Sequence, residues 1–221
     1  AEHVFVIVIS TVSWAKVLSL MPSIKKMTII EINPNYIELI KMHPEVRGLL
    51  DDPRVEVVID DGRKWLKRNN TQKFDIILMN TTWHWRAYVS NLLSQNFIQI
   101  IHDRLNKTGL VFYNTTQSMN AYVTAHQVFP YMYQYKFFAL GANQPQQVNL
   151  TEIKNNLCLL KNPLTKSAVF PNEVQCQKAA EVITENILIP YEDIKFNQKN
   201  RDLEVITDDN MITEFKYGKG L

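Results

Sequence analysis

Short apolar runs recur along the chain, and most of them contain almost no polar position. Runs of this length and composition are typical of strands that are covered on both faces of a parallel sheet. The predicted strands are residues 4–9, 27–32, 55–59, 74–79, 110–113, 135–140 and 156–160. The least interrupted run, 74–79, ends abruptly at Asn80. We expect this run to lie at the centre of the sheet.

Segments with helical periodicity separate these runs, and two of them begin with a clear helix-capping signal. Asn33 stands before Pro34, which is favoured at the first helical position, and Ser94 stands before a stripe of apolar residues. The predicted helices are residues 14–20, 34–43, 63–68, 95–105, 118–129 and 172–187. Strands and helices that alternate in this way predict an α/β fold with a doubly wound, mostly parallel sheet.

Composition is ordinary for a soluble globular protein and argues against two classes of partner. Hydrophobic residues make up 46% and charged residues 21% of the chain. The net charge of +2 predicts neither nucleic acid nor an anionic membrane surface as a partner. Cys158 and Cys176 show no metal-ligand spacing, so we expect two buried, reduced thiols. The histidines are scattered along the chain and predict no metal site.

Polar residues stand where the first four predicted strands end, at Ser10, Thr11, Glu31, Asp60, Asp61, Gly62 and Asn80. Open α/β folds bind ligands at this edge of the sheet. An acidic residue such as Glu31 is the usual acceptor for ribose hydroxyls at a second strand end, although it could also be a surface carboxylate. Asp60 and Asp61 could accept from the amine of adenine, or only form a tight turn with Gly62. Together, these carboxylates predict an adenosine site.

An aromatic and basic cluster, WHWR at residues 83–86, follows Asn80. His84 is a candidate general base, because an unperturbed imidazole titrates close to neutral pH. The tryptophans and Arg86 could stack on a planar group or hold an anionic one. The alternative is a partly buried aromatic lid with an exposed arginine.

The order of these residues resembles the spermidine synthase family, the polyamine aminopropyltransferases. The matching motifs are TIIEINP at residues 28–34, LDDPRVE at 50–56, DDGR at 60–63, FDIILMN at 74–80 and NLLSQNF at 91–97. The run 49–62 is the most specific part of this resemblance. Residues 80–86 and the tail from ITDDN at 206–210 through KYG at 216–218 are most similar to spermidine synthase-like domains that are attached to membrane segments.

The resemblance implies a Rossmann-like sheet of seven strands, of the kind that methyltransferases share with this family. Residues 1–160 would form a nucleoside-binding domain, and residues 161–221 a helix and tail that pack on the same domain. The donor substrate would be decarboxylated S-adenosylmethionine, S-adenosylmethionine or a relative, and no metal would take part.

The resemblance also implies a role for each residue at the strand ends. Glu31 would hold the ribose of the donor and Asp61 would lie at its adenine, with Asp60 and Gly62 as further donor-binding residues. The turn at Ser10 and Thr11 would face the thioether end. Asn80 would lie beside the donor, at the position of the family's catalytic aspartate.

Three departures from the family pattern bear on activity. Val8 and Val12 stand where the first turn of the family carries glycine, and their side chains should obstruct a close approach of the backbone to the ligand. Asn80 is an amide, which cannot accept the proton of an amine as a carboxylate does. The N-terminal β-hairpin region of the family has no counterpart in this sequence.

These observations favour a spermidine synthase-like transferase domain that binds an adenosyl-sulfonium donor. The alternatives are an S-adenosylmethionine-dependent methyltransferase and an inactive scaffold that keeps the fold. The expected partner is a small-molecule acceptor, an amine or another compound, and the family pattern also allows a homodimer. No apolar run reaches transmembrane length, so we expect a cytoplasmic domain. Because the chain enters a core strand almost at once, we also expect an upstream region, which could be a membrane segment.

Overall fold

The computed structural model describes residues 1–8, 12–80, 89–116, 118–185, 187–196 and 203–210. Its strands are β1 (His3–Ile7), β2 (Lys26–Glu31), β3 (Val55–Ile59), β4 (Phe74–Met79), β5 (Leu105–Asn114), β6 (Tyr131–Tyr135), β7 (Phe138–Ala142) and β8 (Ile189–Pro190). Its helices are α1 (Val12–Ser19), α2 (Asn35–Lys41), α3 (Pro44–Arg47), α4 (Gly62–Arg68), α5 (Ser90–Leu93), α6 (Gln95–Asp103), α7 (Met119–His126), α8 (Leu150–Cys158) and α9 (Glu173–Thr184), followed by a 3-10 turn, η1 (Tyr191–Asp193).

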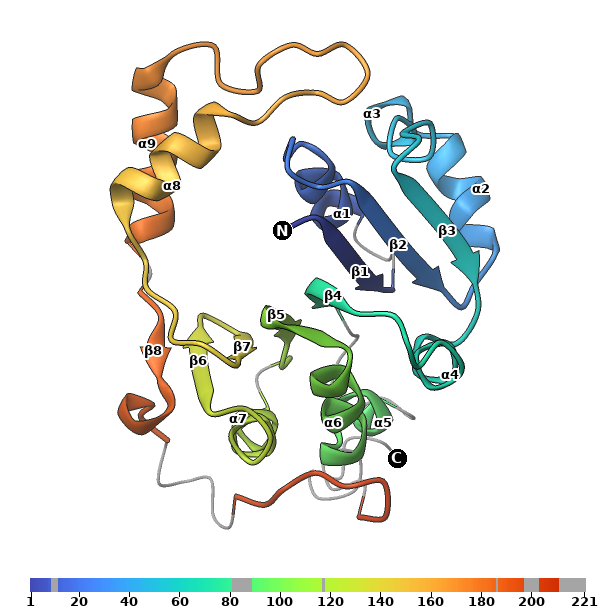
Figure 1. The fold of residues 1–221 in the computed structure, drawn as a ribbon, viewed down its shortest axis with the longest axis vertical. Helices are drawn as coiled ribbons and strands as arrows, with labels where there is room; N and C mark the ends of the chain where they lie inside the picture. The colour runs from blue at the N-terminus through green and yellow to red at the C-terminus, as the bar shows by residue number, and fades with distance from the viewer. Residues whose placement is uncertain (9–11, 81–88, 117, 186, 197–202, 211–221) are drawn as a thin grey trace.

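The strands form one sheet in the order β3-β2-β1-β4-β5-β7-β6-β8 (Figure 1). Strands β1 to β5 pair in parallel, whereas β7, β6 and β8 join by antiparallel pairings. The prediction of a Rossmann-like, mostly parallel α/β sheet is therefore confirmed. The predicted number of strands is corrected from seven to eight, and β4 lies between β1 and β5.

Successive residues of the central strands point into two cores, one on each face of the sheet. Phe5 and Ile7 of β1 enter the core beneath α4, α6 and α7, whereas Val4 and Val6 enter the core beneath α1 and α2. This arrangement follows from the alternation of side chains along a strand. A strand covered on both faces needs apolar residues at both sets of positions, which explains its unbroken apolar run.

Two predicted strands are wrong, both in the second half of the chain. Residues 135–140 form the tip of the β6–β7 hairpin, in which Tyr135 pairs with Phe138. Lys136 takes the turn with a φ of 54°, and because no glycine or asparagine marks this turn, the aromatic run looked continuous. Residues 156–160 follow the course of α8 and its end, and the helix begins at the capping side chain of Asn149, which accepts a hydrogen bond from the Glu152 amide at 3.0 Å.

The prediction of two reduced thiols is also wrong, because Cys158 and Cys176 form a disulfide. It joins the end of α8 to the first turn of α9, with the two Cα atoms 5.5 Å apart. The sequence separates the two cysteines by an irregular loop, so only the packing of the two helices against each other brings them together.

The most specific stretch of the family resemblance ties the start of β3 to the end of α1. Arg54 donates hydrogen bonds to the carbonyl oxygens of Ser19, Met21 and Ile24. Its guanidinium also pairs with the buried carboxylate of Asp52, with an N–O distance of 2.7 Å. Burial raises the pKa of Asp52, but the hydrogen bonds and charge of Arg54 outweigh it, so this pKa lies below its usual value. This pair therefore has a structural role.

Candidate active site

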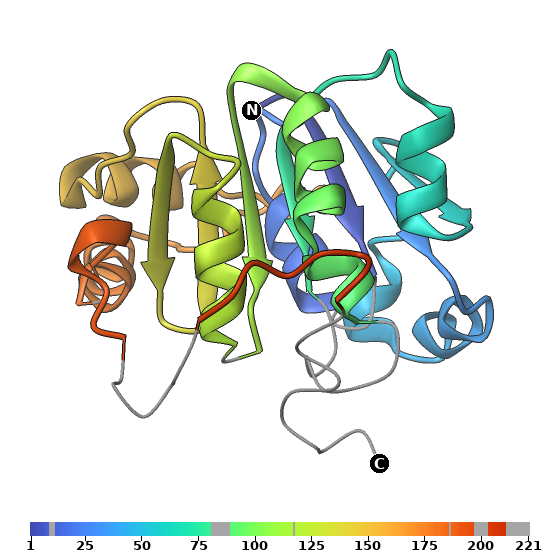
Figure 2. The same cartoon turned by 90° about the horizontal axis from the view of Figure 1, so that it is seen from below.

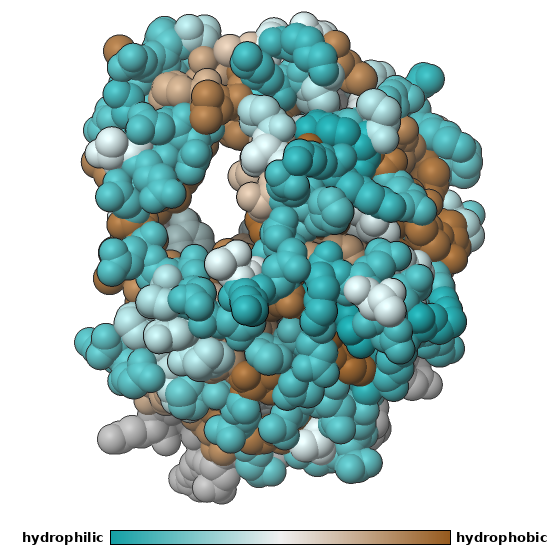
Figure 3. Space-filling view, in the orientation of Figure 1, coloured by the Kyte–Doolittle hydropathy of each residue, from teal (hydrophilic) through white to brown (hydrophobic). Residues whose placement is uncertain are grey.

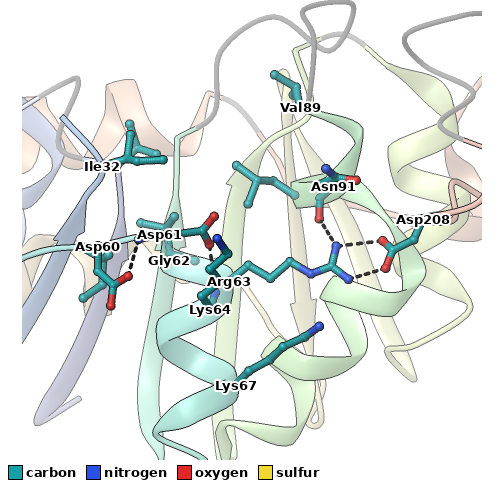
Figure 4. A pocket seen from close by; sticks show the side chains of 14 residues that line it. Ile32, Asp60, Asp61, Gly62, Arg63, Lys64, Lys67, Val89, Asn91 and Asp208 are labelled. Carbon is teal, nitrogen blue, oxygen red and sulfur yellow. Dashed lines mark hydrogen bonds and ion pairs between the residues drawn. The ribbon is translucent and has the colours of Figure 1, made fainter.

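A cavity of about 670 Å³ opens at the edge of the sheet where β1, β2 and β3 end. We call it the sheet-edge cavity (Figure 4). It is lined by Ile7, Val8, Ile30, Ile32, Asp60, Asp61, Gly62, Arg63, Lys64, Lys67, Val89, Asn91, Leu92 and Asp208. Its position agrees with the rule that open α/β sheets bind ligands beyond the carboxyl ends of their strands.

The turn from β3 into α4 forms one wall of the cavity. Asp61 caps α4, because its Oδ1 accepts a hydrogen bond from the Lys64 amide at 2.9 Å. Asp60 accepts from the Asp61 amide at 2.8 Å and forms an ion pair with Arg68. Thus Asp60 and Asp61 both lie at the cavity, and each carboxylate already holds a part of the turn.

Gly62 allows the start of α4 to lie directly against the end of β1. A Cβ atom at this position would come within 2.8 Å of Cγ2 of Ile7. Any larger residue would displace either the Ile7 side chain or the first turn of α4. The tight Asp-Gly turn and the cavity wall are therefore one feature of the structure.

Val8 lines the cavity and adopts a φ of 71°, a backbone conformation that β-branched residues rarely take. Its amide donates to the Ile30 carbonyl oxygen at 3.0 Å, which fixes the turn after β1 next to β2. The chain thus keeps at Val8 the left-handed conformation that glycine favours, while adding a side chain that occupies cavity space. Val12 is the first residue of α1 and is not among the lining residues.

Glu31 and Asn80 lie at strand ends, but neither is among the residues that line the described part of the cavity. Glu31 is only 1% exposed, and its Oε1 accepts a hydrogen bond from the Asn33 amide at 2.8 Å. The Asn80 amide lies next to β1, and its Oδ1 accepts from Nδ2 of Asn114 at 3.2 Å. Asn80 therefore belongs to a pair of neutral amides at the ends of β4 and β5.

The remaining predicted site residues lie outside the described residues. These are Ser10 and Thr11 of the first turn, and His84 with the aromatic and basic cluster around it. Their roles remain predictions.

Sequence reasoning missed an ion pair between Arg63 of α4 and Asp208 in the C-terminal tail (Figure 4). Nη1 of Arg63 donates to Oδ1 of Asp208 and to the carbonyl oxygen of Asn91, each at 2.8 Å. Hydrogen bonds from Arg63 and one from Ser94 outweigh burial and hold the pKa of Asp208 below its usual value. The DDGR and ITDDN motifs contain both residues, but nothing in the sequence pairs them.

Within the described ranges, no group of three or more His, Cys, Asp or Glu side chains is placed to hold a metal ion. Nor does the described part of the chain contain a helix long and apolar enough to cross a membrane. The described lining residues offer a ligand hydrogen bonds, ion pairs and apolar contacts.

Fold and cavity together define a Rossmann-like α/β protein of the methyltransferase type, with a cavity at the ends of β1, β2 and β3. Residues 14–142, more than half of the chain, match the spermine/spermidine synthase domain family. The chain belongs to this family.

Among relatives, the polyamine aminopropyltransferase of Thermococcus onnurineus is 29% identical over 131 residues, which span 56% of this chain and 46% of that enzyme. The polyamine aminopropyltransferase of Caldicellulosiruptor saccharolyticus is 28% identical over 179 residues, 72% of this chain and 64% of that enzyme. The matches thus cover about half to two thirds of these relatives.

The fold is similar to that of solved spermidine synthases. The spermidine synthase of Thermotoga maritima matches with a TM-score of 0.60 and 19% identity, over 80% of this chain and 68% of its own. A spermidine synthase in complex with the transition-state analogue AdoDATO matches with a TM-score of 0.61, again at 19% identity, over 80% of this chain and 69% of its own. At this identity, the likeness shows the fold alone.

Proposed function

We propose that this chain is the donor-binding domain of a spermidine synthase-like aminopropyltransferase. Its sheet-edge cavity would bind decarboxylated S-adenosylmethionine or a close relative. The observation that carries the proposal is the position of the Asp60-Asp61-Gly62 turn in the wall of this cavity, inside the region that matches the family. The relatives named as polyamine aminopropyltransferases and the solved complex with AdoDATO support it.

The residues of the cavity suit a nucleoside with a planar base. Asp61 uses Oδ1 to cap α4, and its Oδ2 would accept a hydrogen bond from the exocyclic amine of adenine. Ile32 lines the cavity and is 67% exposed, so the face of a base packed against it would remove apolar surface from water. Glu31, which the family pattern assigns to the ribose hydroxyls, is 1% exposed and does not line the described part of the cavity, so a contact with the ribose would require its side chain to become exposed.

Aminopropyl transfer needs few protein groups at the donor. An amine nitrogen attacks the methylene carbon next to the sulfonium, the carbon–sulfur bond breaks with its electron pair passing to sulfur, and methylthioadenosine leaves as a neutral thioether. The attacking nitrogen then loses a proton. Asn80 would orient the amine through its amide oxygen but cannot take this proton, so the acceptor side is where activity should be limited.

The test is release of methylthioadenosine from decarboxylated S-adenosylmethionine, with a panel of diamines as acceptors. We expect slow release by the parent chain and faster, diamine-dependent release by Asn80→Asp, because a carboxylate can attract the diamine and accept its proton. Asn114→Asp is the matched control, since it adds the same charge to the partner amide. Methyl transfer from S-adenosylmethionine, with no release from the decarboxylated donor by either chain, would contradict the proposal.

A further inference from the structure

The C-terminal strap, residues 203–210, runs across α7 and ends against α6, and its hydrogen-bond partners there lie 82 and 112 residues away in the sequence (Figure 2). The Glu204 amide donates to Oδ1 of Asn120 at 3.1 Å, and the Ile206 amide donates to Oγ1 of Thr124 at 2.9 Å. The Ile206 side chain is fully buried in the core beneath these helices. The strap is therefore packed into the domain through both hydrogen bonds and a buried side chain.

The strap ends in a tight set of contacts around Asp208. Two parallel hydrogen bonds join the Arg63 guanidinium to this carboxylate, and Oγ of Ser94 donates to its Oδ1 at 2.6 Å. The Asp208 amide donates to Oδ1 of Asn96 at 3.1 Å. Ser94 is fully buried and also caps α6. A bidentate arginine–carboxylate pair with a buried hydroxyl donor is among the strongest side-chain arrangements in proteins.

This set of contacts joins two walls of the sheet-edge cavity. Arg63 follows Gly62 in the first turn of α4, and its Nη1 also donates to the carbonyl oxygen of Asn91 in α5. Asp208 thus holds the arginine in place between α4 and α5 (Figure 4). Without the carboxylate, the guanidinium would be released toward the cavity that it lines.

Charge gives the strap a second effect on the ligand. The lining residues contain three carboxylates, Asp60, Asp61 and Asp208, and three cations, Arg63, Lys64 and Lys67. Removing the Asp208 charge leaves two carboxylates against three cations and frees a guanidinium for an anionic ligand. The substitution raises the net charge of the cavity lining by one, whatever the protonation state of the other lining groups.

We propose that Asp208 is a specificity-determining residue of the donor site. Through Arg63 it sets the spacing of α4 and α5 and neutralises the arginine, so that the cavity accepts neutral or cationic adenosine derivatives and rejects those with a phosphate. This inference rests on the proposed function, because it assumes that the cavity holds an adenosine derivative. Asp208 is a positioning residue and takes no part in the chemistry.

The test is calorimetric titration of three ligands, methylthioadenosine, decarboxylated S-adenosylmethionine and adenosine monophosphate, into the parent chain and Asp208→Asn. We expect the variant to lose roughly tenfold in affinity for the cationic donor, less for methylthioadenosine, and to gain roughly tenfold for the monophosphate. Asp209→Asn, which makes the same charge change at the exposed neighbouring residue, should behave as the parent does.

The double variant Arg63→Gln with Asp208→Asn removes both charges and should return the ratio of the monophosphate and donor affinities to that of the parent. A thermal scan of each variant shows whether it is folded. If Asp208→Asn does not fold, Ser94→Ala, which removes one donor to the same carboxylate, should shift the ratio in the same direction and less.

The experiment distinguishes a failure of the proposed function from a failure of the role proposed for Asp208. A parent chain that binds neither methylthioadenosine nor the donor would overturn the proposed function. A parent chain that binds both, with Asp208→Asn showing an unchanged affinity ratio, would overturn the role of Asp208 alone.

Discussion

At Val8 the backbone holds a conformation that costs a β-branched residue about 1 to 3 kcal/mol. The strain sits where the cavity meets the first turn after β1, and it persists because the Val8 amide is fixed to β2. The sequence predicted that valine here would obstruct the ligand. What it could not show is that the backbone keeps the geometry of a glycine turn.

Val8→Gly should therefore tighten the binding of methylthioadenosine, by roughly tenfold or about 1.4 kcal/mol, without lowering the melting temperature. The side chain leaves cavity space, and relief of strain offsets the packing that is lost. Calorimetric titration and a thermal scan measure the two effects. Val58→Gly, in the regular strand β3, is the control and should lower the melting temperature with unchanged affinity. Similar behaviour of the two variants would contradict this account of Val8.

The ion pair between Asp52 and Arg54 makes the stability of the fold depend on pH. Because the folded state lowers the pKa of Asp52 below its unfolded value near 3.8, the pair stabilises the fold fully above that value. This stabilisation is lost as the pH falls through the lower, folded-state pKa. Asp52 is 1% exposed at its side chain, so the loss should be a measurable part of acid unfolding.

Asp52→Asn should lower the free energy of unfolding at pH 7 by about 2 to 3 kcal/mol, below the range for a fully buried pair because Arg54 is partly exposed. Its unfolding free energy should also depend less on pH below about pH 4 than that of the parent. Urea titrations at several pH values test both points. Asp51→Asn, at the exposed neighbour, should leave the pH dependence as it is, and an equal slope for parent and Asp52→Asn would refute the role of the pair.

At the scale of elements, α8 and α9 pack mainly against each other and have little core of their own. No residue of α8 is buried, and α9 buries only Cys176 and Ala180. The space-filling view shows an opening between this helix pair and the rest of the molecule (Figure 3). The disulfide therefore holds these two helices together, as apolar packing holds the other helices of the domain.

Reducing the Cys158–Cys176 bond should loosen this helix pair and leave the sheet-edge cavity unchanged. A cross-link across a separation of 18 residues contributes about 3 kcal/mol in the chain-entropy account. Limited proteolysis with and without reductant should show new cleavage within residues 143–188 only. The double variant Cys158→Ser with Cys176→Ser should match the reduced parent. Unchanged protection of these residues, or loss of nucleoside affinity on reduction, would contradict this division of the molecule.

The elements best predicted from the sequence are strands that are buried on both faces, because these form unbroken apolar runs. Strands β1, β2 and β4 follow the predicted runs to within a few residues, because a central parallel strand is covered on both faces and needs apolar residues at nearly every position. The β6–β7 hairpin was missed because Lys136 turns the chain without glycine. The end of helix α8 was taken for a strand because residues 157–160, Leu-Cys-Leu-Leu, form a short apolar run that periodicity alone cannot assign to a helix or a strand.

At the scale of the whole molecule, the cavity is assembled from segments that are distant in sequence. The Asp60-Asp61-Gly62 turn was predicted because strand ends and parallel pairing are readable from the sequence, and it lies in the cavity wall. Asp208 was not predicted as a site residue, since 145 residues separate it from Arg63 and only the docking of the strap brings them together. Glu31 was predicted at its strand end, and its deep burial became visible only in the folded chain.

Calorimetric titration of methylthioadenosine shows whether the sheet-edge cavity binds an adenosine derivative through the turn at Asp61. We expect a dissociation constant of about micromolar for the parent. Asp61→Asn keeps a capping side chain at α4 but loses the carboxylate, so it should fold and bind more weakly. Asp209→Asn should match the parent. Absence of binding by a folded parent chain at millimolar ligand, or equal affinity of parent and Asp61→Asn, would contradict the claim.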